Sequence, residues 1–302
     1  MRASSQRDLP SKFIASTLSE NQESGNQRVE LIGVDFSGNA DQWRPTVSRP
    51  NVWVAFGISG AETLKVSGLV PVQDLPGPEA PFLKLRRLFA ERHGSTCAID
   101  APFSLPSQFV GEGTEQVWRR TSMLPRENRP FCRGGALVQA LASDLPPRGK
   151  KIYRDTETHW IRKGVNTRST TWYGPRGGAP FAAACMSLLA GHEGAVWPFQ
   201  KNGLGATLCE AFPAAQLRHW GLPHRGYSEA SRGATVRRLI VAALEERHEL
   251  DIPPDLRTLC FGSADSLDVV ICLYAARAVG GSMLASDLGP SARAEGWIAI
   301  HR

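Results

Sequence analysis

The sequence predicts an α/β fold in which a mixed sheet of five strands is flanked by helices. Short apolar runs bounded by turn signals alternate with longer runs at helical spacing. The 302 residues are 42% hydrophobic, enough for a large core, and no apolar run is long enough to span a membrane. We place the domain at residues 29–302 and expect residues 1–28, rich in Ser, Gln, Asn and charge, to form a flexible tail.

The first half of the sheet is predicted from three strands, a helix and a fourth strand. Residues 29–36, 51–58 and 62–70 are strand-like apolar runs, and a Ser-Gly-Ala turn signal separates the second from the third. A loop rich in Pro and Gly then leads to residues 81–94, where apolar side chains recur at helical spacing. Residues 95–100 follow as a short strand that a nearby proline ends.

The second half of the chain alternates between helices and short strands. Capping glycines and apolar periodicity predict helices at 180–191, 213–221, 234–249 and from about Ser263 to Gly281. Apolar runs predict strands at 193–199, 206–213 and 296–302.

This element order is that of the ribonuclease H-like (RNase H-like) fold. In that fold the first strand is central, its acidic residue lies beside the end of the fourth strand, and the last helix brings further acids to the same place. We therefore predict an RNase H-like domain with an insertion after its fourth strand, at about residues 104–178.

Five acidic residues lie at the ends of the predicted buried elements, and we predict that they are catalytic: Asp35, Asp100, Glu210, Asp265 and Asp268. A carboxylate at such a position must be hydrated, paired or bound to a cation, because bare burial costs several kcal/mol. The spacing of Asp265 and Asp268 puts both on one face of a helix, so they can share a cation. An N-cap for Asp265, and an ion pair with an arginine for any of the acids, are the structural alternatives.

The predicted insertion is strongly basic. It carries thirteen Lys and Arg against six Asp and Glu, together with several aromatic residues. This mixture suits phosphate contacts and base stacking, although a solvated insertion with structural aromatics is the alternative. The candidate nucleic-acid contacts are Arg119, Arg120, Lys150, Lys151, Arg154, Arg162, Lys163, Arg168, Trp160 and Trp172.

Other kinds of site find little support. The six cysteines are scattered without a CxxC pair, which argues against a zinc site or a disulfide framework and predicts reduced, mostly buried thiols. The Gly-x-Ser-x-Gly motif of serine hydrolases is absent from the sequence.

Several short motifs resemble, in order and spacing, those of domain-of-unknown-function family 429. They are GVDFSG, AIDAPFSLP, the VWPF and EAFPA pair, SADSLDVVICLYAA and, in the insertion, YRDTETHWIRKG. The similarity covers roughly residues 29–302, and the family is described as predicted RNase H-like nucleases. The closing Asp-x-x-Asp is similar to that of RuvC-type resolvases, whereas the Ala-Pro after Asp100 and the additional Glu210 depart from their pattern.

The resemblance and the acids together imply hydrolysis of phosphodiester bonds with two Mg²⁺ or Mn²⁺ ions, which prefer carboxylate oxygens. Asp35 would bridge the ions, Asp100 would complete the shell of one, and Asp268, with or without Asp265, would bind the other. Glu210 would ligate a metal or orient water. Asp35, Asp100 and Asp268 are therefore the predicted metal ligands.

Two further functions remain open at this stage. The loop after Asp35 looks like the phosphate loop of actin-like ATPases and sugar kinases, but only one copy of the strand, meander and helix pattern is visible. A non-catalytic nucleic-acid-binding or assembly module is the other alternative. For the nuclease we expect DNA or RNA as partner, a cytoplasmic location and no membrane contact. The sequence leaves the oligomeric state open, with a homodimer suggested only by analogy with RuvC-type resolvases.

Overall fold

The computed structural model describes residues 29–302 apart from 112, 142–150, 200–201, 282, 285 and 287. The predicted tail at 1–28 and the candidate contact Lys150 lie outside the described residues.

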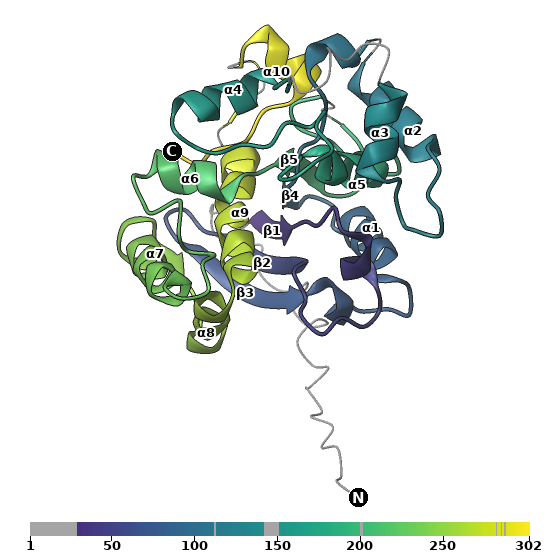
Figure 1. The fold of residues 1–302 in the computed structure, drawn as a ribbon. Coiled ribbons are helices and arrows are strands. Elements are labelled where there is room, and N and C mark those ends of the chain that lie inside the picture. Colours follow the sequence, from purple (N-terminus) through teal and green to yellow (C-terminus); the bar gives the residue numbers. More distant parts are fainter. Residues whose placement is uncertain are drawn as a thin grey trace, which may run out of the picture.

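Six strands form one mixed sheet in the order β5-β4-β1-β2-β3-β6 (Figure 1). The strands are β1 (Val29–Asp35), β2 (Trp53–Ser59), β3 (Leu64–Pro71), β4 (Thr96–Asp100), β5 (Thr207–Glu210) and β6 (Leu250–Asp251). β1, β2 and β3 are an antiparallel meander, β4 and β5 run parallel to β1, and β6 runs parallel to β3. The predicted α/β class is confirmed. The described sheet has six strands instead of five because it includes β6, a two-residue strand too short for any sequence pattern to reveal.

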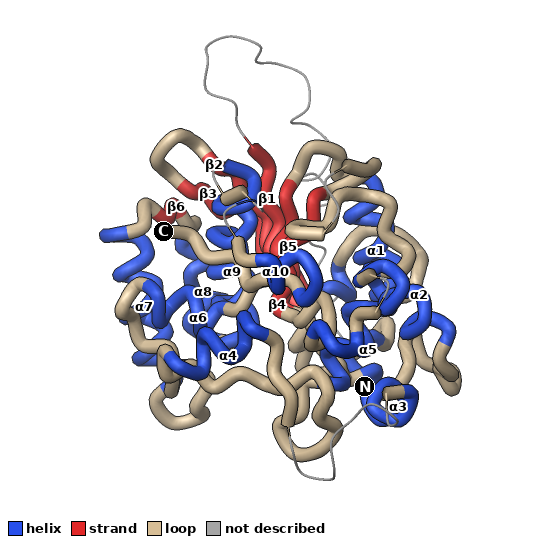
Figure 2. Tube along the Cα trace, turned by 90° about the horizontal axis from the view of Figure 1, so that it is seen from above, coloured by secondary structure: helices blue, strands red, loops and turns tan. Residues whose placement is uncertain are grey.

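Helices cover both faces of the sheet, which Figure 2 shows edge-on between them. One layer contains α1 (Pro81–Glu91) and α5 (Ala179–Leu189), with α2 (Thr114–Met123) and α3 (Gly134–Ala140) packed on α5. The opposite layer contains α6 (Pro213–His219), α7 (Gly233–Arg247), α8 (Pro254–Gly262) and α9 (Ala264–Gly281). Two short helices, α4 (Asp155–Arg162) and α10 (Pro290–Glu295), pack against each other.

Strand β1 is buried on both faces, which explains its nearly continuous apolar sequence. Ile32 and Val34 point into the core beneath α1 and α5, whereas Leu31 belongs to the core beneath α9. Gly33 also faces α9, and a Cβ atom there would lie only 2.1 Å from the carbonyl oxygen of Val269. The absent side chain therefore lets α9 pack directly on the central strand.

Two predicted strands are not strands in the structure. Within residues 193–199 there is a single bridge, from Val196 to Leu208, and Pro198 lacks the N–H that a longer ladder would need. Within residues 296–302 there is a single bridge, from Ile298 to Glu210. The Ile298 N–H donates to Thr156 Oγ1 at 3.2 Å, so this segment is held by a side chain of the insertion instead of by a full β ladder.

The other predicted strands and helices are present, whereas α8 and α10 were not predicted from the sequence. All six cysteines are buried and free, as predicted. Of the helices that the structure describes, none alone has the length and hydropathy to cross a bilayer; α8 and α9 together, bent by 119°, meet both criteria.

Candidate active site

Two of the predicted acids end neighbouring strands. Asp35 is the last residue of β1 and Asp100 the last of β4, and the two are register partners in the parallel β1–β4 ladder. Adjacent strands are about 4.8 Å apart, so the backbone alone holds these residues side by side. Both side chains keep partial solvent exposure.

Helix α9 brings Asp265 and Asp268 to the same place. Both residues lie in its first turns, one helical turn apart, and the close packing of α9 on Gly33 sets their distance from the sheet. The N-cap position is occupied by Ser263, whose Oγ accepts a hydrogen bond from Asp265 N at 3.2 Å. Because Ser263 caps the helix, the carboxylate of Asp265 is not needed for that task.

The pKa values indicate that the four carboxylates lie in one electrostatic field. Burial, followed by repulsion from Asp100, Asp268 and Asp265, holds the pKa of Asp35 well above its usual range. The pKa of Asp268 is raised well above its usual range by burial and by the Asp100 and Asp265 charges. Burial is also the largest cause that raises the pKa of Asp100, to about 7, and that of Asp265. The pKa of Asp265 is in turn lowered by a hydrogen bond with the Asp35 side chain. Carboxylates gathered and buried in this way favour a bound cation.

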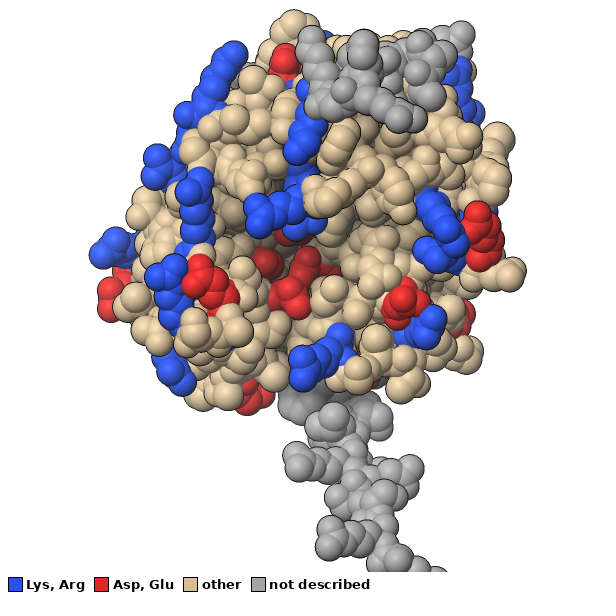
Figure 3. Space-filling model, in the orientation of Figure 1, with Lys and Arg blue, Asp and Glu red and all other residues tan. Residues whose placement is uncertain are grey.

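Three side chains partly offset this negative charge. The guanidinium of Arg168 lowers the pKa of Asp100 against the effect of burial. Arg237 lowers the pKa of both Asp265 and Asp268, and Tyr227 donates a hydrogen bond of 3.0 Å to Asp268 Oδ1. Figure 3 shows acidic side chains on the floor of a hollow over β1 and α9, with Lys and Arg side chains above it.

Glu210 differs from the four aspartates because its carboxylate is already paired. Arg154 Nη1 and Nη2 donate to its two oxygens at 2.7 and 2.6 Å, and Phe103 N donates at 3.1 Å. Arg154 Nε also reaches Glu157 at 2.9 Å. The structure therefore supports the ion-pair alternative for Glu210. Its charge still raises the pKa of Asp100, because Glu210 ends the neighbouring strand β5 and is the register partner of Ile99.

The comparisons with known proteins give one result. A protein-family model described as "Protein of unknown function (DUF429)" matches residues 33–287, which is most of the chain. The chain belongs to the DUF429 family. No curated protein and no solved structure matched it. The matched part of this DUF429 chain contains all five predicted catalytic acids.

Two of the predicted nucleic-acid contacts of the DUF429 chain lie in the core. Arg154 is 1% exposed and holds Glu210 and Glu157, and Trp160 is 2% exposed. Neither residue can therefore contact nucleic acid, and both predictions were wrong. Composition indicated a basic, aromatic surface, but it could not show that Arg154 pairs with Glu157 of α4 and with Glu210 of β5.

The other described candidates keep solvent exposure. Arg119 and Arg120 are exposed on α2, Arg162 and Lys163 at the end of α4, and Lys151 lies over the ring of Trp172 at 5.5 Å. Arg168 is exposed as well and is close enough to act on Asp100. The insertion of the DUF429 chain therefore brings at least one predicted phosphate contact beside the acids.

The donor chemistry of the hollow suits a hard divalent cation, but a ligand set is not preformed. Carboxylate oxygens are the ligands that Mg²⁺ and Mn²⁺ prefer. The raised pKa values of Asp35 and Asp268 are consistent with a site whose negative charges a bound cation would stabilise. Among the residues that the structure describes, no three His, Cys, Asp or Glu side chains already stand in a metal-binding arrangement.

Sequence reasoning missed two residues of the site. Tyr227 lies in a loop without a recognisable pattern. Arg237 carried a usable signal, because it shares the buried face of α7 with Ile240, Val241 and Leu244 at spacings of three, four and seven residues. A charged residue at a predicted core position indicates a buried role.

Proposed function

We propose that this DUF429 chain is a divalent-metal-dependent nuclease with an RNase H-like fold. The observation that carries the proposal is the register pairing of Asp35 with Asp100, joined by Asp265 and Asp268 from α9. The antiparallel meander, the parallel β4 and β5, and a long helix packed on the central strand support the fold assignment. β6 would be an addition at the edge of β3.

The four aspartates are the residues that would hold the cations. Asp35 would contribute to the binding of both ions. Asp100 would help to bind one of them, and Asp268 together with Asp265 would help to bind the other. Two bound Mg²⁺ or Mn²⁺ ions would activate a water and stabilise the leaving oxygen of a phosphodiester. Since the described side chains are not in a ligating arrangement, we expect cation binding to draw the carboxylates together.

The remaining charged groups would have supporting roles. Arg168 would contact a phosphate of the substrate while limiting the repulsion at Asp100. Lys151, Arg162, Lys163, Arg119, Arg120 and Trp172 would bind the flanking backbone and bases. Glu210 would act from within the core, by anchoring Arg154 to the end of β5.

A cleavage assay tests the proposal. Purified protein is incubated with labelled single-stranded DNA, duplex DNA, RNA and RNA–DNA hybrid, with Mg²⁺, with Mn²⁺ and with a chelator. We expect metal-dependent cleavage of at least one substrate, and a loss of at least about 100-fold in Asp35→Asn and Asp268→Asn, because each removes a ligand charge. Asp251→Asn is the matched control. Asp251 is exposed and is the register partner of Lys65 in the β3–β6 ladder, near the start of β3 and away from the four aspartates.

One alternative has a specific observation in its favour. The lack of a preformed ligand set among the described side chains is compatible with a module that binds nucleic acid without cutting it. Such a module would bind DNA or RNA with steep salt dependence and would leave every substrate intact with either metal. Cleavage that persists in Asp35→Asn would instead point to a contaminating nuclease and would sink the proposed site.

A further inference from the structure

The hydroxyl of Tyr227 is hydrogen-bonded to one carboxylate oxygen of Asp268, a proposed metal ligand. It donates to Asp268 Oδ1 at 3.0 Å, although the two residues are 41 positions apart in the sequence. Tyr227 is 9% exposed and lies in the loop between α6 and α7. A cation bound by both oxygens would have to share Oδ1 with this hydrogen bond, so the contact favours coordination through Oδ2 alone.

The backbone of Tyr227 is itself fixed by Arg237. Nη1 of Arg237 donates to Tyr227 O, while Nε and Nη2 donate to Phe261 O at 3.0 and 2.7 Å. One side chain thus ties the Tyr227 loop to the last turn of α8, just before the helix that carries Asp265 and Asp268. A Cβ at Gly233 would lie 2.6 Å from Tyr227 O, so the glycine makes room for this arrangement.

The number of oxygens that a carboxylate offers affects which cation it binds. Ca²⁺ takes six to eight oxygens at about 2.3–2.6 Å and often uses both oxygens of one carboxylate. Mg²⁺ requires a nearly octahedral shell at about 2.0–2.1 Å, which single oxygens and waters supply. A carboxylate with one oxygen held by a fixed tyrosine is therefore better suited to the smaller ion.

We propose that Tyr227 is a positioning residue that restricts Asp268 to one oxygen and thereby makes the site select Mg²⁺ and Mn²⁺ over Ca²⁺. The inference rests on the proposed metal site and adds a determinant of its selectivity. Arg237 acts through Tyr227 by holding the ring in place.

Metal binding measured without substrate tests this role. Metal-free full-length protein is titrated with MnCl₂ and with CaCl₂ by calorimetry, and the ratio of the two affinities is compared between wild type and Tyr227→Phe. We expect the variant to lose at least about tenfold in the preference for Mn²⁺ over Ca²⁺, because Asp268 can then bind with both oxygens. Tyr274→Phe is the matched control: it removes another buried tyrosine hydroxyl, which donates to His248 O at 2.9 Å, and should leave the ratio unchanged.

The outcomes separate this inference from the proposed function. If wild type binds neither ion, the metal site fails and the selectivity role falls with it. If wild type binds Mn²⁺ and Tyr227→Phe keeps the wild-type ratio within about twofold, the role of Tyr227 is overturned while the metal site stands. Should Tyr227→Phe not fold, Arg237→Lys replaces it: a lysine cannot reach Tyr227 O and Phe261 O together, so the ratio should shift in the same direction, and an unchanged ratio overturns the role.

Discussion

Arg154 holds both oxygens of Glu210, with Nη1 at 2.7 Å from Oε2 and Nη2 at 2.6 Å from Oε1. Arg154 also pairs with Glu157 and donates to the carbonyl oxygen of Glu295 at 3.1 Å. One buried side chain therefore joins the basic insertion, the end of β5 and the last residue of α10. Burial disfavours its charge, but Glu210 and Glu157 outweigh burial and raise the pKa of Arg154.

Removal of Arg154 should be strongly destabilising. Arg154→Met leaves the carboxylates of Glu210 and Glu157 buried without their partner, and we expect a loss of about 3–5 kcal/mol in the free energy of unfolding. Urea denaturation at neutral pH measures it. Arg44→Met is the control, because it breaks a 2.7 Å pair with Asp41 whose side chains are 70% and 65% exposed, and should cost less than about 1 kcal/mol. Equal losses in the two variants would contradict the anchoring role.

Burial of the Asp100 carboxylate, together with repulsion from Glu210 and Asp265, should appear as a pH-dependent difference in stability between wild type and a variant without this charge. Folding raises the pKa of Asp100 to about 7, so between about pH 4 and 7 the folded state holds a proton that the unfolded state releases. The stability that this proton gives the wild type is complete below about pH 4 and is lost as the pH rises through 7. The side chain of Asp100→Asn does not ionise, so the stability of this variant relative to wild type should increase over this range, by at most about 4 kcal/mol and by less where solvent screens the half-exposed carboxylate.

Urea denaturation of both proteins at several pH values, without divalent metal, checks this prediction. The comparison uses the difference between the two proteins because lowered histidine pKa values, such as that of His301 at about 4, act in the opposite direction on both. A difference that stays constant from pH 4 to 7 would contradict it.

A side chain at Gly33 should separate the two pairs of acids. The Cβ of Gly33→Ala would lie 2.1 Å from Val269 O, so α9 must move away from β1 and carry Asp265 and Asp268 with it. We expect a loss of about 2–4 kcal/mol in the free energy of unfolding, together with weaker Mn²⁺ binding. Gly281→Ala at the other end of α9, where an added Cβ meets nothing within 4 Å, should change both quantities little. Wild-type Mn²⁺ affinity in Gly33→Ala would show that α9 does not set the position of the acids.

The sequence located the acids because each stands at the boundary of a strongly patterned element. The apolar runs before Asp35 and Asp100 could only be strands in this context, and the long apolar helix after Asp265 was equally clear. The pairing of Glu210 was left open at that stage, since its partner Arg154 is 56 positions away. Composition likewise could not show that Arg154 is buried.

The errors have physical causes as well. Residues 193–199 and 296–302 have the apolar composition of strands, but a strand also needs a neighbour that accepts its N–H groups. Pro198 has no N–H group, and the N–H of Ile298 donates to the side chain of Thr156 instead of to a strand. Tyr227 and Arg237 were missed because their role depends on contacts between distant segments, such as Tyr227 with Asp268.

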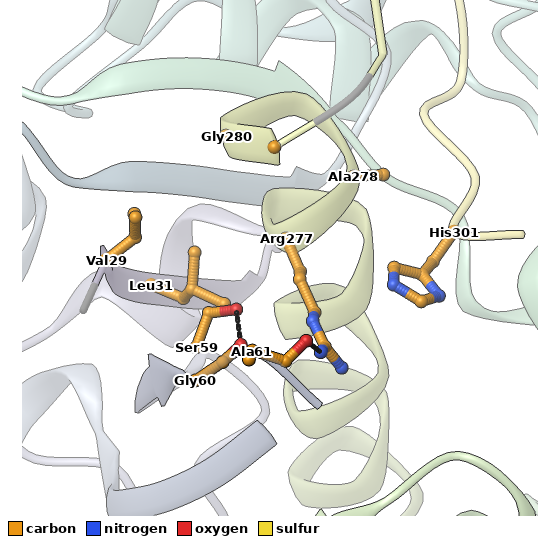
Figure 4. Close-up of a pocket in the computed structure, with 10 residues that line it drawn as sticks. Val29, Leu31, Ser59, Gly60, Ala61, Arg277, Ala278, Gly280 and His301 are labelled. Carbon is orange, nitrogen blue, oxygen red and sulfur yellow. Dashed lines mark hydrogen bonds between the residues drawn. The ribbon is translucent and has the colours of Figure 1, made fainter. Parts of the chain in front are cut away.

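Helix α9 makes specific contacts near both of its ends. Its first turns carry Asp265 and Asp268. Near its last turn, Arg277 donates to Glu62 O at 2.7 Å in the hairpin between β2 and β3, and its side chain lines a pocket between this hairpin and the end of α9 (Figure 4). Deleting one residue between these points would turn one end against the other by about 100° and swing the aspartates away from the sheet. The part of α9 between Asp268 and Arg277 can therefore accept substitutions but not insertions or deletions.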